Sequence, residues 1–236
     1  MMKKLVIGML ILISVVVMSC SDDDGYSLND YWIGFGILKV ESGAYQIYLD
    51  DGAVLKPVAW NIPPWEEDEW KDGSRILVNF TILEDETNET GEVESYLVKV
   101  NEAKKILMKG VLDITEENAD SIGNDPIVVQ KYWMTDSLIS FKLKYWGYYQ
   151  VHYLNLVQDP DEATTEDGKV RLELRHNANG DEESIPYTAY VSFTLNQFRE
   201  EGKDSIVFEI SSTDYDGVTH TFDEVFDYSE LELPNP

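Results

Sequence analysis

The chain has 236 residues, with 45 acidic and 18 basic side chains and a formal net charge of −27. A surface this acidic repels phosphate backbones and anionic lipid headgroups, which argues against nucleic acid as a partner and against membrane attachment through a basic patch. Because 43% of the residues are hydrophobic and 12% are aromatic, the chain is expected to fold around a core rather than form an acidic disordered tail.

The first nineteen residues have the pattern of a secretory signal. Lys3 and Lys4 form a basic start, and Leu5–Met18 is almost wholly apolar. A helix of that length rises about 21 Å, which is too short for the roughly 30 Å hydrocarbon core of a bilayer. Residues 1–19 are therefore predicted to be a removable signal peptide rather than a membrane-spanning helix.

Cys20 is the only cysteine of the chain. The stretch Val17–Cys20 resembles a bacterial lipobox, in which the thiol is alkylated with diacylglycerol and the cysteine becomes the first residue of the mature protein. A single cysteine excludes a disulfide framework, and acylation explains a lone thiol in an oxidising compartment. Cys20 is therefore predicted to anchor the protein through its acyl chains. The alternative is a plain signal peptide followed by an incidental cysteine.

Residues 20–30 are predicted to be an acidic tether. Ser21, Asp22, Asp23 and Asp24 resemble the export signal found directly after the lipidated cysteine in surface lipoproteins of the Bacteroidota. This pattern predicts a lipid-anchored protein of the outer membrane that is displayed on the cell surface. The alternative is the periplasmic face of that membrane, with the aspartates acting only as a solvated spacer.

Residues 31–116 are predicted to form a small β-barrel. Apolar side chains occupy every second position, for example Ile76, Val78 and Phe80, which is the period of a half-buried strand. The expected strands are Trp32–Val40, Ala44–Asp50, Val54–Val58, Arg75–Leu83 and Ser95–Val111, the last with a possible helical turn at Glu102–Leu107. Five strands in this length suit a Greek-key barrel of the OB type.

Residues 117–126 are polar, contain Gly123 and end at Pro126, which predicts a linker between two domains. Residues 127–230 then show the same alternation, which predicts an immunoglobulin-like β-sandwich followed by a short tail, 231–236. The expected strands are Ile127–Thr135, Leu138–Trp146, His152–Gln158, Lys169–His176, Tyr187–Leu195, Ser205–Ser211 and Val218–Phe226. One further helical turn is expected at Asn196–Glu201. The predicted fold class is all-β.

The combination of lipobox, acidic tether, OB-like domain and C-terminal sandwich resembles the NigD-like lipoproteins of the Bacteroidota. The sharpest element of the resemblance is a Gly-x-Arg-(Ile/Val)-x-Val-Asn strand, present here as Gly73–Asn79. The family is named after a bacteriocin-associated locus, and its general activity is not established. The resemblance therefore implies a fold and a compartment, and it supplies no active-site residues.

The best candidate for a ligand site is Trp60–Trp70. Its residues Trp60, Trp65 and Trp70 recur every five positions around two prolines, with Glu66, Glu67, Asp68 and Glu69 in the gap. Indole faces and carboxylates suit sugar rings, because C–H groups stack on the rings and hydroxyls donate to the acids. The alternative is that the tryptophans plug the end of the barrel while the acids face water.

No catalytic, metal or cofactor site is predicted. His152, His176 and His220 lie far apart in sequence without a zinc-binding spacing, and no serine-nucleophile or phosphate-loop motif occurs. The acidic stretches Asp159–Glu162 and Asp214–Gly217 resemble calcium loops only faintly, because neither continues into an EF-hand ligand set. They are expected to be solvated loops.

Three Asp-Ser-apolar tripeptides resemble the O-glycosylation signal of exported Bacteroidota proteins. Their acceptor serines are Ser121, Ser137 and Ser205.

Three functions are compatible with these features. The first is a non-enzymatic surface lipoprotein that binds a glycan or a protein partner through loops of its β-domains. The second is an accessory subunit of an envelope complex, which an exposed apolar patch on the sandwich would favour. The third is a carbohydrate-active hydrolase, which would need a cleft with convergent carboxylates.

Overall fold

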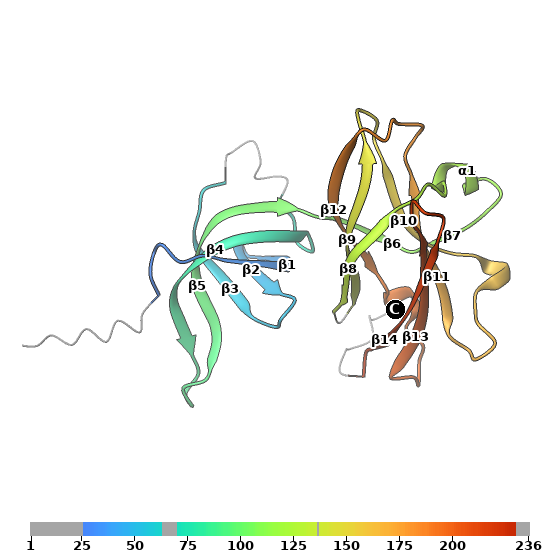
Figure 1. The fold of residues 1–236 in the computed structure, drawn as a ribbon. Coiled ribbons are helices and arrows are strands. Elements are labelled where there is room, and N and C mark those ends of the chain that lie inside the picture. Colours follow the sequence, from blue (N-terminus) through green and yellow to red (C-terminus); the bar gives the residue numbers. More distant parts are fainter. Residues whose placement is uncertain (1–25, 63–69, 136, 230–236) are drawn as a thin grey trace, which may run out of the picture.

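The computed structural model describes residues 26–62, 70–135 and 137–229. Figure 1 shows two β-domains joined by one chain connection, a barrel formed by the N-terminal half and a sandwich formed by the C-terminal half. The all-β class, the OB-like barrel and the sandwich are thus confirmed. The predicted signal peptide, Cys20 and Ser21–Asp24 lie outside the described residues. None of the described helices is long and apolar enough to cross a membrane.

The barrel closes because its strands bury one face and pair at both edges. In the order β1-β2-β3-β5-β4, only β3 and β5 run parallel. Its strands are β1 (Trp32–Glu41), β2 (Ala44–Leu49), β3 (Val54–Trp60), β4 (Arg75–Thr87) and β5 (Val93–Lys105). Every second side chain of β4 points inward, so Ile76, Val78, Phe80 and Ile82 form much of the core.

The sandwich packs a five-stranded sheet, β14-β13-β11-β10-β7, on a four-stranded sheet, β6-β12-β9-β8. Aromatic residues such as Phe141, Phe193 and Phe208 fill the space between the sheets. The strands are β6 (Leu107–Gly110), β7 (Leu112–Asp113), β8 (Val128–Met134), β9 (Leu138–Gly147), β10 (Tyr153–Gln158), β11 (Val170–Asn177), β12 (Ile185–Thr194), β13 (Ser205–Thr213) and β14 (Thr219–Asp227).

The chain leaves the barrel earlier than the sequence analysis expected. Strand β6 pairs in parallel with β12, and β7 pairs in parallel with β10, so both belong to the sandwich. Only Ile106 separates β5 from β6. The expected linker 117–126 instead lies within the sandwich, where it connects β7 to β8 and contains the short helix α1 (Ala119–Ile122).

Two local expectations have opposite outcomes. The helical turn expected at Glu102–Leu107 is wrong, because β5 continues to Lys105 and pairs there with Ile76 of β4. The turn expected at Asn196–Glu201 is present as the 3-10 helix η3 (Asn196–Phe198). A further 3-10 helix, η2 (Pro160–Glu162), begins the loop after β10.

Candidate functional site

A fully buried arginine joins the two domains. Arg75 opens β4, and both ends of its guanidinium bind the carboxylate of Asp50, the residue that follows β2. On the sandwich side the same guanidinium donates to the hydroxyls of Ser140 on β9 and Ser192 on β12, each at 3.2 Å. A buried arginine is stable only when its charge and its N–H groups are satisfied, so these partners fix one domain against the other.

Aromatic rings continue this junction toward solvent. Phe35 of β1 lies 4.9 Å from the ring of Trp133 on β8 and 5.0 Å from the ring of Tyr190 on β12. The indole N–H of Trp133 donates to Asp50 at 2.7 Å, so the same carboxylate holds both the arginine and the tryptophan.

Beside these rings lies an open cleft of about 500 Å³. Its other lining residues are Gly34, Leu49, Asp50, Asp51, Lys131 and Lys142. Aromatic walls with a few charged groups at a domain junction are typical of ligand sites. The cleft is therefore a candidate binding site at the junction of the two domains.

The tryptophans predicted to bind sugar are only partly described. Trp60 and Trp70 lie with ring centroids 5.0 Å apart, and both pack against the barrel core together with Tyr45. The indole N–H of Trp70 is buried without a hydrogen-bond partner. Trp65 and Glu66–Glu69 lie outside the described residues. Trp60 and Trp70 are thus partly buried against the barrel core, and the role of the segment in sugar binding stays a prediction.

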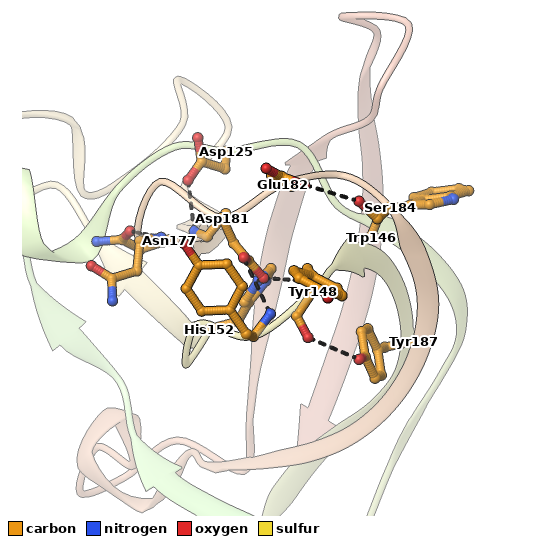
Figure 2. Close-up of polar contacts among 12 residues, drawn as sticks. Asp125, Trp146, Tyr148, His152, Asn177, Asp181, Glu182, Ser184 and Tyr187 are labelled. Atoms are coloured by element: carbon orange, nitrogen blue, oxygen red, sulfur yellow. Dashed lines mark hydrogen bonds and ion pairs between the residues drawn. The ribbon is translucent and has the colours of Figure 1, made fainter.

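The sequence analysis missed a pair formed by His176 and His152, the latter labelled in Figure 2. The Nδ1 atom of His152 lies 2.8 Å from Nε2 of His176, and Nε2 of His152 lies 3.2 Å from Asp181. The Nδ1 atom of His176 lies 2.9 Å from the carbonyl of Pro126. The two histidines are 24 positions apart, and only the antiparallel pairing of β10 with β11 brings them together.

The donor and acceptor roles of these groups show which ring nitrogens carry a proton. The Pro126 carbonyl can only accept, so Nδ1 of His176 donates to it and its Nε2 accepts from His152. The carboxylate of Asp181 also only accepts, so every contact is satisfied when His152 carries a proton on both ring nitrogens. The side chains of Asp181 and His152 are only 1% and 4% exposed, so this contact is shielded from water.

The environment shifts the pKa of both acceptor groups. Burial opposes ionisation of Asp181, but the N–H of Tyr148, the ring of His152 and the N–H of Tyr149 outweigh it and hold its pKa well below the usual range. Burial also lowers the pKa of His176, against the opposing effect of the Pro126 carbonyl. The two shifts favour an ionised Asp181 on one side of His152 and a neutral His176 on the other.

Asp181 also fixes the backbone of the β9–β10 loop. Its carboxylate accepts from the N–H groups of Tyr148 and Tyr149, and the hydroxyl of Tyr187 donates to the Tyr148 carbonyl at 3.3 Å (Figure 2). Six exposed side chains at this end of the sandwich are nevertheless apolar or aromatic. They are Tyr148, Tyr149, Val151, Tyr153, Ile185 and Tyr187, called here the aromatic tip.

We expect Asp181→Ala to loosen this loop. Without the carboxylate, the amides of Tyr148 and Tyr149 lose their acceptor and should exchange with solvent at least about tenfold faster. Amide hydrogen exchange followed by NMR measures the change. The control is Glu182→Ala, which removes an exposed neighbouring carboxylate, and equal exchange in both variants would show that Asp181 does not order the loop.

We expect acid to weaken the fold through His176. Because its pKa is lower in the folded than in the unfolded chain, the unfolded chain binds a proton first, and stability is lost as pH falls below about 6.5. The His176→Gln variant keeps a donor for Pro126 and an acceptor for His152 but does not titrate. The melting temperature of the wild type should therefore fall relative to this variant between pH 7 and pH 5. Parallel melting curves would contradict the assignment.

The remaining predicted sites have ordinary structural surroundings. Ser121 is exposed in α1, although its hydroxyl donates to the carbonyl of Asn118 at 2.8 Å; Ser205 is exposed and Ser137 is half-buried. In the acidic loops, Asp159 and Asp214 accept backbone N–H groups of their own turns. His220 lies 2.6 Å from Asp214 on the surface. Within the described ranges, no cluster of three histidine, cysteine or acidic residues could hold a metal ion.

The fold and the junction define a class of two-domain β-proteins in which an OB-type barrel is locked to a β-sandwich. A family model for the NigD-like N-terminal OB domain matches residues 37–106, and one for the NigD-like C-terminal beta sandwich domain matches residues 110–224. The chain belongs to the NigD-like family, and no catalytic family is indicated. The sequence resembles this family most clearly in the motif Gly73–Asn79. The arginine of that motif is Arg75, which joins the two domains.

Solved structures of similar proteins come from species of Parabacteroides and Bacteroides. A candidate toxin-related protein from Parabacteroides distasonis is 27% identical, with a TM-score of 0.70 over 85% of this chain and 96% of that one. A protein of unknown function from Bacteroides vulgatus is 25% identical, with a TM-score of 0.67 over 88% and 97%. A NigD-like immunity protein from Bacteroides caccae, 19% identical with a TM-score of 0.60 over 86% and 100%, shares the fold. Among curated proteins, none matches the chain.

Proposed function

We propose that this protein is a non-enzymatic, lipid-anchored envelope protein that binds a saccharide in the cleft between its domains. The observation that carries the proposal is the cleft of about 500 Å³, walled by Phe35, Trp133 and Tyr190. Its frame is held by the buried Arg75–Asp50 pair, so a ligand would meet a preformed site and lose little free energy in ordering it. Rings that partly face solvent suit the C–H faces of a sugar, and Asp51, Lys131 and Lys142 suit its polar groups.

The anchor and the location rest on the sequence around Cys20. A candidate lipoprotein from Bacteroides fragilis has the same fold at 12% identity and a TM-score of 0.56. We expect Cys20→Ser to release the protein from the membrane fraction of its host. Protease treatment of intact cells separates the surface from the periplasmic face, because only a surface protein is cleaved. If Cys20→Ser protein stays in the membrane fraction, the lipid anchor is refuted.

Binding is tested with the soluble chain that begins at Tyr26 and retains both domains. Its melting temperature and tryptophan fluorescence are followed against a panel of host and dietary polysaccharides. We expect at least one glycan to shift the melting temperature and fluorescence of the wild type but not those of Tyr190→Ala, which lacks one aromatic side chain of the cleft. The matched control is Tyr187→Ala on the same strand, which lies in the aromatic tip and should bind like the wild type.

The experiment also decides between the cleft and the tryptophan segment. If the shift survives in Tyr190→Ala but is lost in Trp65→Ala/Trp70→Ala, the site lies at Trp60–Trp70. If no glycan shifts the melting temperature of the wild type, saccharide binding is refuted.

The aromatic tip favours a second candidate function, that of an accessory subunit in an envelope complex. Exposed aromatic side chains on a loop held by buried hydrogen bonds resemble the anchors of protein interfaces, because they add contact area at little cost in conformational entropy. Tyr149 is 70% exposed and Val151 is 64% exposed. Crosslinking in the native host, through a photoreactive residue at position 149, tests this function. A partner protein that crosslinks to the wild type but not to the Asp181→Ala variant would support the accessory-subunit function.

A further inference from the structure

Three lysines gather on the outer face of the four-stranded sheet, next to the cleft. In the register of the sheet, Lys131 of β8 lies directly opposite Lys142 of β9, and Lys142 lies opposite Tyr190 of β12. Lys144 follows two residues later on the same face. Side chains in such cross-strand pairs are only about 5 Å apart at Cβ, and like charges there are destabilising.

These three lysines lie close together on a chain that is strongly acidic. The chain has 45 acidic side chains, and several of its lysines form ion pairs with them. Lys56, Lys104, Lys169 and Lys203 each form an ion pair at 3.3 Å or less. Within the described ranges, Lys131, Lys142 and Lys144 form none.

Aromatic rings hold two of these lysines in place. The ammonium of Lys131 lies 5.6 Å from the ring centroid of Trp133, and that of Lys144 lies 4.4 Å from the ring centroid of Trp146. Such contacts orient an ammonium group without neutralising it. The lysines therefore remain available to an external anion.

The charges of the cleft itself favour an anion on its sandwich side. Of its two aspartates, Asp50 is neutralised by the bidentate contact with Arg75 and also accepts from Trp133. Asp51 is exposed on the barrel side, where its carboxylate accepts the N–H of Ala53 at 3.1 Å. Lys131 and Lys142 line the same cleft without such a partner.

We propose that the cleft takes an acidic saccharide, whose carboxylate or sulfate is bound by Lys131 and Lys142 while its ring lies against Tyr190. This inference rests on the proposed function and adds the chemical class of the ligand. A carboxylate and a sulfate offer the lysines the same chemistry, a compact anion on a sugar ring. Each lysine would donate charge-assisted hydrogen bonds to it.

The test measures the affinity of the chain from Tyr26 onward for polygalacturonate, chondroitin sulfate and neutral galactan by calorimetry. The variant is Lys131→Gln/Lys142→Gln. The matched control is Lys39→Gln/Lys71→Gln, which removes the same charge from exposed lysines of the barrel side. We expect a loss of roughly 10-fold to 100-fold for the acidic glycan in the cleft variant and little change in the control. Preference for polygalacturonate over chondroitin sulfate would assign the anion as a carboxylate, and the reverse would assign a sulfate.

Each other outcome has a defined meaning. If neutral galactan binds as well as the acidic glycans and the cleft variant is unchanged, the acidic class is refuted while saccharide binding stands. If no glycan binds, both proposals fail, and lysine-dependent binding of polyglutamate would then assign the face to an acidic protein partner. An equal loss in cleft variant and control would reveal unspecific attraction and refute the site.

The folding of the cleft variant has its own readout. Since Lys131 and Lys142 repel each other, their replacement by glutamine should leave the melting temperature unchanged or raise it. A loss of affinity in a variant that melts no lower than the wild type cannot come from unfolding.

Discussion

Replacing Arg75 by methionine is expected to lower the free energy of unfolding by about 3–5 kcal/mol, because breaking a buried ion pair leaves its partner uncompensated. Asp50 would lose both guanidinium contacts, and Ser140 and Ser192 would lose their shared donor. Urea unfolding followed by tryptophan fluorescence measures the change. Because the residue joins the domains, we also expect the barrel and the sandwich to unfold in separate transitions in this variant.

Two further variants test the cause of this loss. Arg171→Met removes a half-exposed arginine that pairs with Glu209 at 3.3 Å on the sandwich surface, and it should cost less than about 1 kcal/mol. The double variant Arg75→Met/Asp50→Leu removes both charges and should recover part of the stability. If Arg75→Met costs no more than Arg171→Met, the buried pair does not hold the domains together.

The second large effect is expected at Gly36, on the inner side of β1. A Cβ atom there would lie 2.6 Å from the backbone carbonyl oxygen of Tyr48 and 3.0 Å from Ile47. That carbonyl belongs to β2, the strand paired with β1, so it cannot move without distorting the barrel. Gly36→Ala should therefore cost about 2–3 kcal/mol in urea unfolding.

Gly34 offers a matched control two residues earlier on the same face. Its added Cβ would meet only the end of the Leu49 side chain, at 3.1 Å, and that side chain can rotate away. Gly34→Ala should cost less than about 1 kcal/mol. Similar losses in both variants would mean that the close approach of β1 and β2 does not limit the barrel.

The sequence predicted the strands well because their signal is local. Alternation of apolar and polar residues depends only on neighbours, and it located β4 and β9 within a few residues. The helical turn expected at Glu102–Leu107 failed because its helix-forming residues are paired as a strand with β4. Pairing with a distant strand overrides local preference.

The domain boundary depends on pairing that no local signal reports. Residues 107–113 follow β5 without a turn or a polar break, yet they pair with β12 and β10. The segment 117–126 is polar and contains glycine and proline, as linkers do, but a loop inside a sandwich has the same composition. Composition therefore placed the boundary about ten residues late.

The candidate site was even less accessible from sequence. Arg75 was visible as part of a family motif, but its partners lie in a turn of the barrel and on two strands of the sandwich. Lys131 and Lys142 were ordinary solvent-facing residues until the register of β8 and β9 placed them side by side. Composition indicated a ligand site only at the tryptophan segment Trp60–Trp70. Its described members Trp60 and Trp70 pack on the barrel core.

The order in which the chain is synthesised affects the order in which the contacts of the domain junction can form. Every strand of the barrel ends at or before Lys105, whereas β6 pairs with β12, which is synthesised much later. Arg75 and Asp50 are both barrel residues, so they can pair early, on a surface still in contact with water. Ser140 and Ser192 reach them only when the sandwich docks. In that order of events, docking of the sandwich dehydrates an ion pair that the barrel already holds, and a chain that stops before docking would leave this polar face exposed.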